Sequence, residues 1–274
     1  MTTLRIMTEI FDDIKTRYVF EAPCRELGNF IEYYWESSSD GRCGASGSAP
    51  FTMKLFRSWT PTLSFNLGSP YEVILGKDRF VLDAKSDVLH FRSTTSAYKY
   101  DTGNHKFGVK FFPGTLGAVL NLDPKLYDEK LVPLKQVLPP VLITKVKTAA
   151  SFPERVALLQ DYFLTCYHSI AGTKHSLQLV RDAIQYQYRS LTSKNQEIAA
   201  GIFTTRKTLY RNFTAVIGAS PKEYFSVVRA RTALNTYIKH RKSFDPTDFG
   251  YYDWSHFHKA VFRLVGRKLF EEGA

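Results

Sequence analysis

The sequence predicts an α+β protein, with a β-rich, barrel-like N-terminal domain with flanking helices and an all-α C-terminal domain. The first observation is a series of short runs rich in aromatic and β-branched residues, from Arg17 to about Pro113. Gly, Pro, Asp or Ser closes each run at a spacing of roughly 8–12 residues, which is typical of sandwiches and barrels. The second is the helical spacing of apolar residues from Ser176 onward.

Charge divides the chain in the same way. Residues 1–173 carry 20 Lys/Arg and 18 Asp/Glu, a balance of +2, whereas residues 174–274 carry 17 and 8, a balance of +9; together these give the net +11. We therefore expect an N-terminal sensing or dimerisation domain at 1–173 and a second domain at 174–274. A basic second domain favours a polyanionic partner. The alternative is a basic surface that serves only solubility.

Several classes of protein are disfavoured. No apolar run approaches the ~20 residues that a membrane span needs, and acidic residues interrupt the N-terminus where a signal peptide requires an apolar core. Cys24, Cys43 and Cys166 give neither a disulfide framework nor a zinc spacing. We expect a cytoplasmic, nucleoid-associated protein without membrane contact, metal or other cofactor.

The N-terminal elements follow from pattern and period. Helical spacing appears at Gly114–Leu122 and Phe152–Ile170, and LPPVLITKVKTAA (138–150) between them is interpreted as a connecting segment. The Gly/Ser-rich stretch Ser37–Pro50 predicts a loop. The expected strand-bearing runs are 54–68, 71–76, 79–84, 87–93, 97–103 and 106–114.

The C-terminal domain begins with an amphipathic helix, HSLQLVRDAIQYQYRS (175–190). Ser193 and Gln196 form a capping-box pattern that opens a short helix, and Gly201 stops it. Thr204 or Thr205 then caps a longer helix that Gly218 ends. A short helix, a tight turn with glycine and a second helix indicate a helix-turn-helix unit.

The longer helix has two distinct faces. Leu209, Phe213 and either Val216 or Ile217 recur on one face and should be core. The basic opposite face suits the major groove, where Arg and Lys read guanine and Asn reads adenine. The alternative is a solvated basic face. The residues expected on it are Arg206, Lys207, Tyr210, Arg211 and Asn212 or Thr214.

The stretch YYDWSHFHKAVFRLVG (251–266) indicates a second such helix, with Asp253 as its N-cap. His256 and His258 are two apart, so they cannot chelate one metal as an i, i+4 pair could. We interpret His256 as a hydrogen-bonded structural histidine. The predicted buried stripe is Trp254, Phe257, Val261 and Leu264, and the predicted outward side chains are Ser255, His258 and Lys259.

These motifs resemble the AraC/XylS family of bacterial transcription regulators. The resemblance lies in Thr205-x-Lys207-x-Leu209-x-Arg211-x-Phe213, in GASPxxY (218–224), in ARTALNTYI (230–238) and in GYYDWSHFHKAVFRLVG (250–266). It implies two helix-turn-helix units joined by a long helix, each unit reading one segment of the major groove. The DNA-binding residues expected are Thr205, Arg206, Lys207, Tyr210, Arg211, Trp254, Ser255, His258 and Lys259.

The second unit departs from the family pattern. RKSFDPTDFG (241–250) is about two residues short, and Pro246 falls where it should break the unit's first helix. Lys268 and Leu269 replace the usual Thr-Pro. We therefore expect a distorted second unit that contacts mainly DNA backbone, and the sequence leaves open whether it reads bases.

The front half resembles, more loosely, an uncharacterised domain found ahead of such DNA-binding modules. The most specific piece is FGVKFFPG (107–114), a strand that ends at a Pro-Gly turn. In the wider family these domains are cupin-like barrels that bind a small effector, dimerise, or both. Trp35, Trp59, Phe65 and Tyr98 are candidates for an effector pocket, with plain core as the alternative reading.

The expected function is a non-enzymatic, sequence-specific regulator that binds double-stranded DNA. Its further partners would be a small-molecule effector, RNA polymerase if it is an activator, and a second copy of the chain. One alternative is a cupin-like metal enzyme with a nucleic-acid-binding tail, for which the strand region offers only His90 and His105. Another is an interaction module that has lost specific DNA binding.

Overall fold

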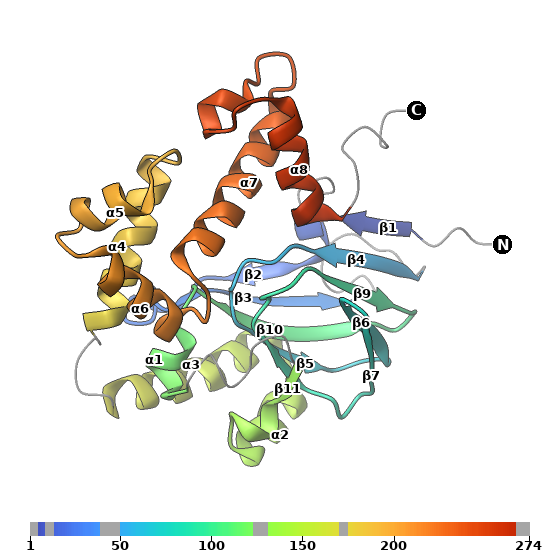
Figure 1. Ribbon diagram of the computed structural model, residues 1–274. Coiled ribbons are helices and arrows are strands. Elements are labelled where there is room, and N and C mark those ends of the chain that lie inside the picture. The colour runs from blue at the N-terminus through green and yellow to red at the C-terminus, as the bar shows by residue number, and fades with distance from the viewer. Residues whose placement is uncertain (1–4, 9–13, 39–49, 123–130, 170–174, 267–274) are drawn as a thin grey trace. The chain divides into compact units, whose positions relative to one another are not determined.

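The computed structural model describes residues 5–8, 14–38, 50–122, 131–169 and 175–266 (Figure 1). The chain divides into two compact units, one of Met1–Leu55 with Trp59–Gly172 and one of Phe56–Ser58 with Thr173–Ala274. The boundary predicted at 173/174 falls within residues 170–174, outside the described residues, and stays a prediction. Each unit has its own core, so each is described separately.

The first unit is built on two β-sheets. One has the strand order β1-β4-β9-β6-β7, in which β1 and β4 are parallel and the other pairs are antiparallel. Its strands are β1 (Arg5–Thr8), β4 (Phe51–Leu55), β6 (Tyr71–Leu75), β7 (Asp78–Leu82) and β9 (Ser96–Tyr100). The other has the order β11-β8-β5-β10-β3-β2. Its strands are β2 (Val19–Glu21), β3 (Ile31–Ser38), β5 (Thr62–Asn66), β8 (Val88–His90), β10 (His105–Phe111) and β11 (Leu131–Pro133).

Alternation of apolar and polar residues places one face of the first sheet in the core. In β6 and β9 every second residue is buried, as a half-buried strand requires. On β10, Gly108 faces Trp35 of β3, and a Cβ at this glycine would lie 2.5 Å from Trp35 Cζ2. The glycine therefore leaves room for the indole beside the backbone. The α+β fold class, with a barrel-like first unit, is confirmed.

Helices flank this unit. They are α1 (Leu116–Leu120), α2 (Pro140–Thr148) and α3 (Phe152–Ser169), with 3₁₀ turns at η1 (Ile14–Arg17) and η3 (Leu134–Gln136). Residues 138–150 were predicted to be a connecting segment, and this prediction was wrong because they contain the helix α2. Pro140 stands at the first helical position, where a missing N–H costs nothing. Val146 is fully buried and α2 packs on α3, so tertiary packing stabilises a helix that its β-branched residues disfavour.

The predicted loop at Ser37–Pro50 also changes at its start. Ser37 and Ser38 belong to β3, where they pair with Lys106 and His105 of β10. Both serines are buried. The strand therefore continues two residues further than the Gly/Ser composition indicates, and residues 39–49 lie outside the described residues.

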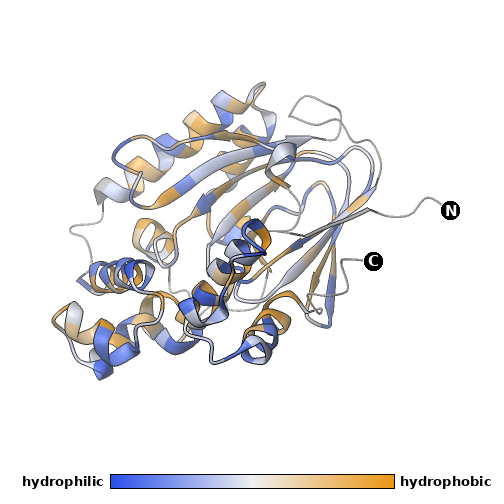
Figure 2. Cartoon of the chain, turned by 90° about the horizontal axis from the view of Figure 1, so that it is seen from above, coloured by the Kyte–Doolittle hydropathy of each residue, from blue (hydrophilic) through white to orange (hydrophobic). Residues whose placement is uncertain are grey.

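The second unit is helical. It contains α4 (His175–Arg189), α5 (Asn195–Gly201), α6 (Arg206–Val216), α7 (Pro221–Lys239), the 3₁₀ turn η4 (Pro246–Phe249) and α8 (Trp254–Val265). Figure 2 shows both hydrophilic and hydrophobic stretches on the helical ribbons of the chain. Near the start of α7, the Phe213 ring of α6 contacts Phe225 at 5.0 Å between centroids. Near its end, Tyr237 contacts Phe257 of α8 at 5.8 Å. The long helix therefore carries one short-helix-and-helix unit at each end.

In the described part of the chain, the helices are all too short or too polar to cross a membrane.

Candidate nucleic-acid interface

Lys194 is the N-cap of α5, the short helix of the first predicted helix-turn-helix. The Glu197 carboxylate accepts a hydrogen bond from the Lys194 backbone N–H at 3.0 Å. The predicted cap pair was therefore off by one residue, because Ser193 instead donates its hydroxyl to the Ser190 hydroxyl at 2.9 Å. The carboxylate at the third helical position also suits the positive end of the helix dipole.

Gly201 has a packing role that the sequence pattern did not reveal. A Cβ at this position would lie 2.1 Å from Cε2 of Tyr186 on α4. Phe203, two residues later, has φ of +55° in the left-handed region, and its side chain is 98% exposed. Glycine is thus needed for contact between α4 and α5, and phenylalanine takes the left-handed position of the turn.

Thr205 caps α6, because its Oγ1 accepts a hydrogen bond from the Thr208 N–H at 3.1 Å. Leu209, Phe213 and Ile217 are buried, as expected, with Ile217 rather than Val216 in the core. The opposite face is exposed and carries Arg206, Lys207, Tyr210 and Arg211.

Asn212 does not belong to the exposed face. It is buried, and its side-chain amide donates to the Thr208 carbonyl at 2.8 Å. The Thr214 hydroxyl donates to the Tyr210 carbonyl at 2.8 Å, on the half-exposed flank of the helix. Of the two alternatives that the sequence left open, the side chain at the outer face is therefore Thr214.

Asp253 caps α8, with its carboxylate accepting the His256 N–H at 2.7 Å. Phe257, Val261 and Leu264 form the buried stripe. Trp254 is only partly in this stripe, since it is 42% exposed while its ring contacts Tyr237 edge-on at 5.9 Å. It therefore stands at the border between the core and the outer face.

The exposure of the two histidines differs from the expectation, although His256 is hydrogen-bonded as predicted and its ring meets Tyr251 edge-on at 5.2 Å. His258 is half-buried, with its ring 5.7 Å from Trp254 and 5.8 Å from Phe257, and burial lowers the pKa of its imidazole. His256 is exposed, and its nearest hydrogen bond is a long one of 3.4 Å from the Tyr252 N–H. His256 thus joins the outer face, and His258 supports Trp254.

The outer face of α8 extends further than predicted. Ser255 and Lys259 are exposed, and Arg263 continues the same line at a spacing of four residues. Phe262, beside Arg263, is also exposed. The i, i+4, i+8 spacing of Ser255, Lys259 and Arg263 was readable in the sequence and would have identified the arginine.

Pro246 begins a helical turn instead of breaking a helix. The Asp245 carboxylate accepts hydrogen bonds from the Thr247 N–H and hydroxyl, each at 2.8 Å, and caps η4. Gly250 follows with φ of +71°, which glycine adopts at no steric cost. Phe244 stacks on Phe249 at 5.3 Å and contacts Phe257 at 4.9 Å. The expected distortion reduces to a 3₁₀ turn in place of the first α-helix.

The four predicted effector-pocket residues are all buried. Each packs in a different place: Trp35 against Tyr18, Phe65 against Phe107, and Tyr98 in a 2.7 Å hydrogen bond with His90 Nδ1. Trp59 lies in a loop with φ of +49°. Burial alone fits both a pocket lining and plain core, so their role in an effector pocket stays a prediction.

His90 and His105 have different interaction partners. His90 bonds Tyr98 in the barrel interior, whereas His105 Nε2 lies 3.0 Å from Glu36 Oε1. The other Glu36 oxygen accepts from Arg155 at 3.0 Å, which joins β3 to α3. Across the described residues, no three His, Cys, Asp or Glu side chains are grouped as a metal site requires.

The chain thus combines a β-rich unit that has flanking helices with a helical unit in which a short helical segment precedes each of the two exposed helices, α6 and α8. No family model matches the chain, and no curated protein matches its sequence. Among solved structures, it is similar to ToxT from Vibrio cholerae O395, at 11% identity and a TM-score of 0.45 over 82% of this chain and 97% of ToxT.

Two further structures are similar. The AraC-like transcriptional activator CuxR matches at 12% identity and a TM-score of 0.34, over 82% of this chain and 88% of CuxR. A cupin 2 domain-containing protein from Halorhodospira halophila matches at 14% identity and a TM-score of 0.24, over 35% of this chain and 61% of that protein.

Proposed function

We propose that this protein is an AraC-type transcription regulator that binds double-stranded DNA sequence-specifically in the cytoplasm. The observation that carries the proposal is the pair of exposed, basic faces on α6 and α8, one at each end of α7. Each helix begins at a side-chain N-cap, Thr205 or Asp253, and follows a short helical turn. This is the local geometry of a helix that enters the major groove.

The chemistry of the first face fits this role. Arg206, Lys207 and Arg211 are exposed, so their charged groups are available for guanine edges or phosphates. Tyr210 offers a hydroxyl and a ring for contact with sugar or a thymine methyl group. Thr205, at the N-terminus of α6, lies where free backbone N–H groups favour a phosphate.

The second face supplies a different set of groups. Ser255, His256 and Lys259 are exposed near the start of α8, and Arg263 adds a further charge one turn beyond Lys259. Trp254 and His258 pack against the core and hold the helix start in place. The η4 turn and the Asp253 cap are both formed, which favours a functional second helix-turn-helix over an interaction module that has lost DNA binding.

The N-terminal unit is proposed to bind a small effector, to form a homodimer, or both, and RNA polymerase would be a partner if the protein activates. A cupin-like metal enzyme finds no support in the described side chains, because His90 and His105 have separate partners. Sensing is therefore proposed for the β-rich unit, and DNA recognition for the helical unit.

Selection of random double-stranded DNA on the full-length protein tests this function. Two enriched boxes about one helical turn apart are expected if both helices read bases. Wild type, Arg211→Ala, Arg263→Ala and the charge-matched control Lys145→Ala, an exposed residue of the first unit, are then compared on the selected site. Binding with no enriched sequence would overturn the proposal.

A further inference from the structure

The turn between α5 and α6 holds a phenylalanine in a backbone conformation that normally belongs to glycine (Figure 1). Phe203 has φ of +55°, and its N–H donates to the Ala200 carbonyl at 3.0 Å. The N–H of the next residue, Thr204, donates to the Ala199 carbonyl at 2.8 Å. This pair of hydrogen bonds closes many helices, usually with glycine at the left-handed position, because a Cβ is crowded there. A bulky residue at this position carries backbone strain.

The Phe203 side chain does not offset this strain by packing, because it is 98% exposed. The second helix-turn-helix shows the ordinary solution. After η4, the left-handed position is held by Gly250, with φ of +71°. The chain therefore uses glycine at one turn and an exposed phenylalanine at the other. A strained residue whose ring lies in solvent is a candidate for contact with a partner.

A second exposed ring lies at the corresponding turn of the second helix-turn-helix. Tyr252 directly precedes Asp253, the N-cap of α8, and is 89% exposed. Its neighbour Tyr251 is only 3% exposed and packs against Phe257 at 5.5 Å between ring centroids. Of these two adjacent tyrosines, one therefore belongs to the core and one to the surface. Among the exposed large hydrophobic side chains of the described residues, Phe203 and Tyr252 have the highest exposed fractions.

Both rings lie close to the helix starts that are proposed to meet DNA. Because consecutive Cα atoms are about 3.8 Å apart, the Phe203 Cα lies at most ~7.6 Å from that of Thr205, the N-cap of α6. This distance is about two base steps of ~3.4 Å along one strand. Arg206 and Lys207 follow the N-cap and are exposed. The Phe203 ring therefore borders a basic surface that suits phosphates.

We propose that Phe203 and Tyr252 are accessory DNA contacts, each with its ring against the sugar–phosphate backbone at the edge of the groove that its helix enters. The partner is double-stranded DNA, and the contact is apolar. The ring covers sugar C–H groups, while basic side chains of α6 and α8 meet phosphates or bases. Burial of the Phe203 ring in the complex offsets the strain of the free protein. The role of both rings rests on the proposed function, but it adds contacts outside the two exposed helices.

Fluorescence anisotropy of the full-length protein on its selected DNA site tests the first ring. Phe203→Gly removes the ring and the strain, whereas Phe203→Ala removes the ring and keeps a Cβ. We expect both to weaken DNA binding roughly fivefold or more. The melting temperature should rise in Phe203→Gly, because glycine adopts positive φ without strain. Weaker binding by a more stable protein excludes misfolding as the cause, and Phe203→Tyr, which keeps a ring, should bind like wild type.

The second ring is tested by Tyr252→Ala beside the conservative variant Tyr252→Phe. The control is Tyr188→Ala on α4, which removes another exposed aromatic side chain of the helical unit. We expect only Tyr252→Ala of these three to weaken DNA binding. The salt dependence of affinity should stay unchanged, because a neutral ring releases no counterions from DNA. A smaller salt slope in Tyr252→Ala would show a lost phosphate contact and would contradict the apolar contact.

Unchanged affinity in Phe203→Ala overturns the role of the first ring, even if Phe203→Gly binds more weakly, because flexibility of the turn would then be responsible. Unchanged affinity in Tyr252→Ala overturns the role of the second ring. DNA selection by the wild-type protein separates the two proposals. No enriched sequence in wild type overturns the proposed function, whereas an enriched sequence that every ring variant binds equally overturns the ring contacts alone.

Discussion

The α-carbon of Gly201 lies against the ring of Tyr186, so closely that a Cβ there would fall 2.1 Å from Tyr186 Cε2. This contact sets how α5 packs on α4, and α6 packs on both. We expect Gly201→Ala to lower the free energy of unfolding by about 1–3 kcal/mol, because the added methyl group must displace the ring. Urea denaturation measures the change. Ala200→Ser, on the exposed side of α5, should be close to neutral.

Burial in the barrel lowers the pKa of His90 to about 3. Between pH 6.5 and about 3 the unfolded chain binds a proton on this histidine and the folded chain does not, so stability falls as the pH falls through this window. The expected slope is about 1.4 kcal/mol per pH unit. In His90→Gln, which cannot titrate, the stability measured by denaturation at pH 4 and pH 6.5 should differ less than in wild type. An equal difference in both proteins would contradict this assignment.

Lys207 and Arg211 have different positions on α6, one near its N-terminus and one a turn later. If either side chain reads a base, its substitution by alanine should weaken binding to the preferred site by ~1–3 kcal/mol. It should also lower the specificity for the base at one position of that site. If it contacts phosphate, binding should weaken equally on all sequences and the salt slope should fall by about 0.9. Fluorescence anisotropy on selected and scrambled DNA, at several salt concentrations, distinguishes these results.

On α8 we expect different effects from substitution of two basic side chains, Arg263 and His258. Arg263→Ala should weaken DNA binding with little change in thermal stability, because the side chain is exposed. His258→Ala should lower thermal stability, because its ring packs against Trp254 and Phe257. Paired melting curves and binding isotherms check both. Weaker DNA binding by His258→Ala with unchanged thermal stability would contradict this, and would indicate that His258 lies on the outer face, as the sequence predicted.

The Asp253 carboxylate caps α8 through the His256 N–H at 2.7 Å. We expect Asp253→Ala to cost about 0.5–2 kcal/mol of stability, since an N–H at the helix start loses its acceptor. Asp253→Asn retains an acceptor oxygen and should cost less. A similar loss in both variants, measured by chemical denaturation, would show that the charge and not the hydrogen bond is responsible.

The sequence by itself determined the features that depend on local periodicity and capping. Leu209 and Phe213, four residues apart, had to share one face of a helix, and Thr205 and Asp253 could satisfy N–H groups a few residues away. The outward position of Arg206, Lys207 and Arg211 follows from the same period. The predicted fold class rests on such short-range rules, and the structure confirms it.

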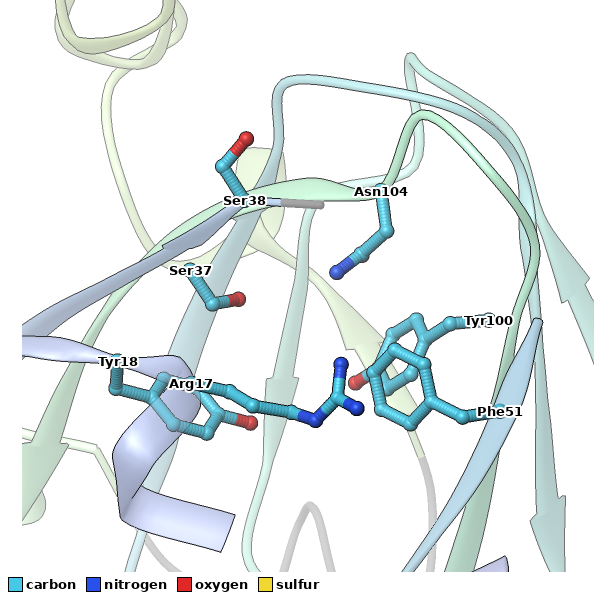
Figure 3. A pocket seen from close by; sticks show the side chains of 7 residues that line it. All are labelled: Arg17, Tyr18, Ser37, Ser38, Phe51, Tyr100 and Asn104. Atoms are coloured by element: carbon cyan, nitrogen blue, oxygen red, sulfur yellow. The ribbon is translucent and has the colours of Figure 1, made fainter. Parts of the chain in front are cut away.

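Only the tertiary structure decided what depends on distant neighbours. His258 is drawn inward by Trp254 and Phe257, which leaves His256 at the surface. Packing of α2 on α3 makes a helix of a segment whose own preferences are weak, and Phe244 stabilises a 3₁₀ turn at Pro246 by stacking on Phe249. A small cavity of the β-rich unit, lined by Arg17 and Asn104, joins residues from separate strands and turns (Figure 3). These outcomes depend on contacts between residues far apart in the chain, which a local pattern does not encode.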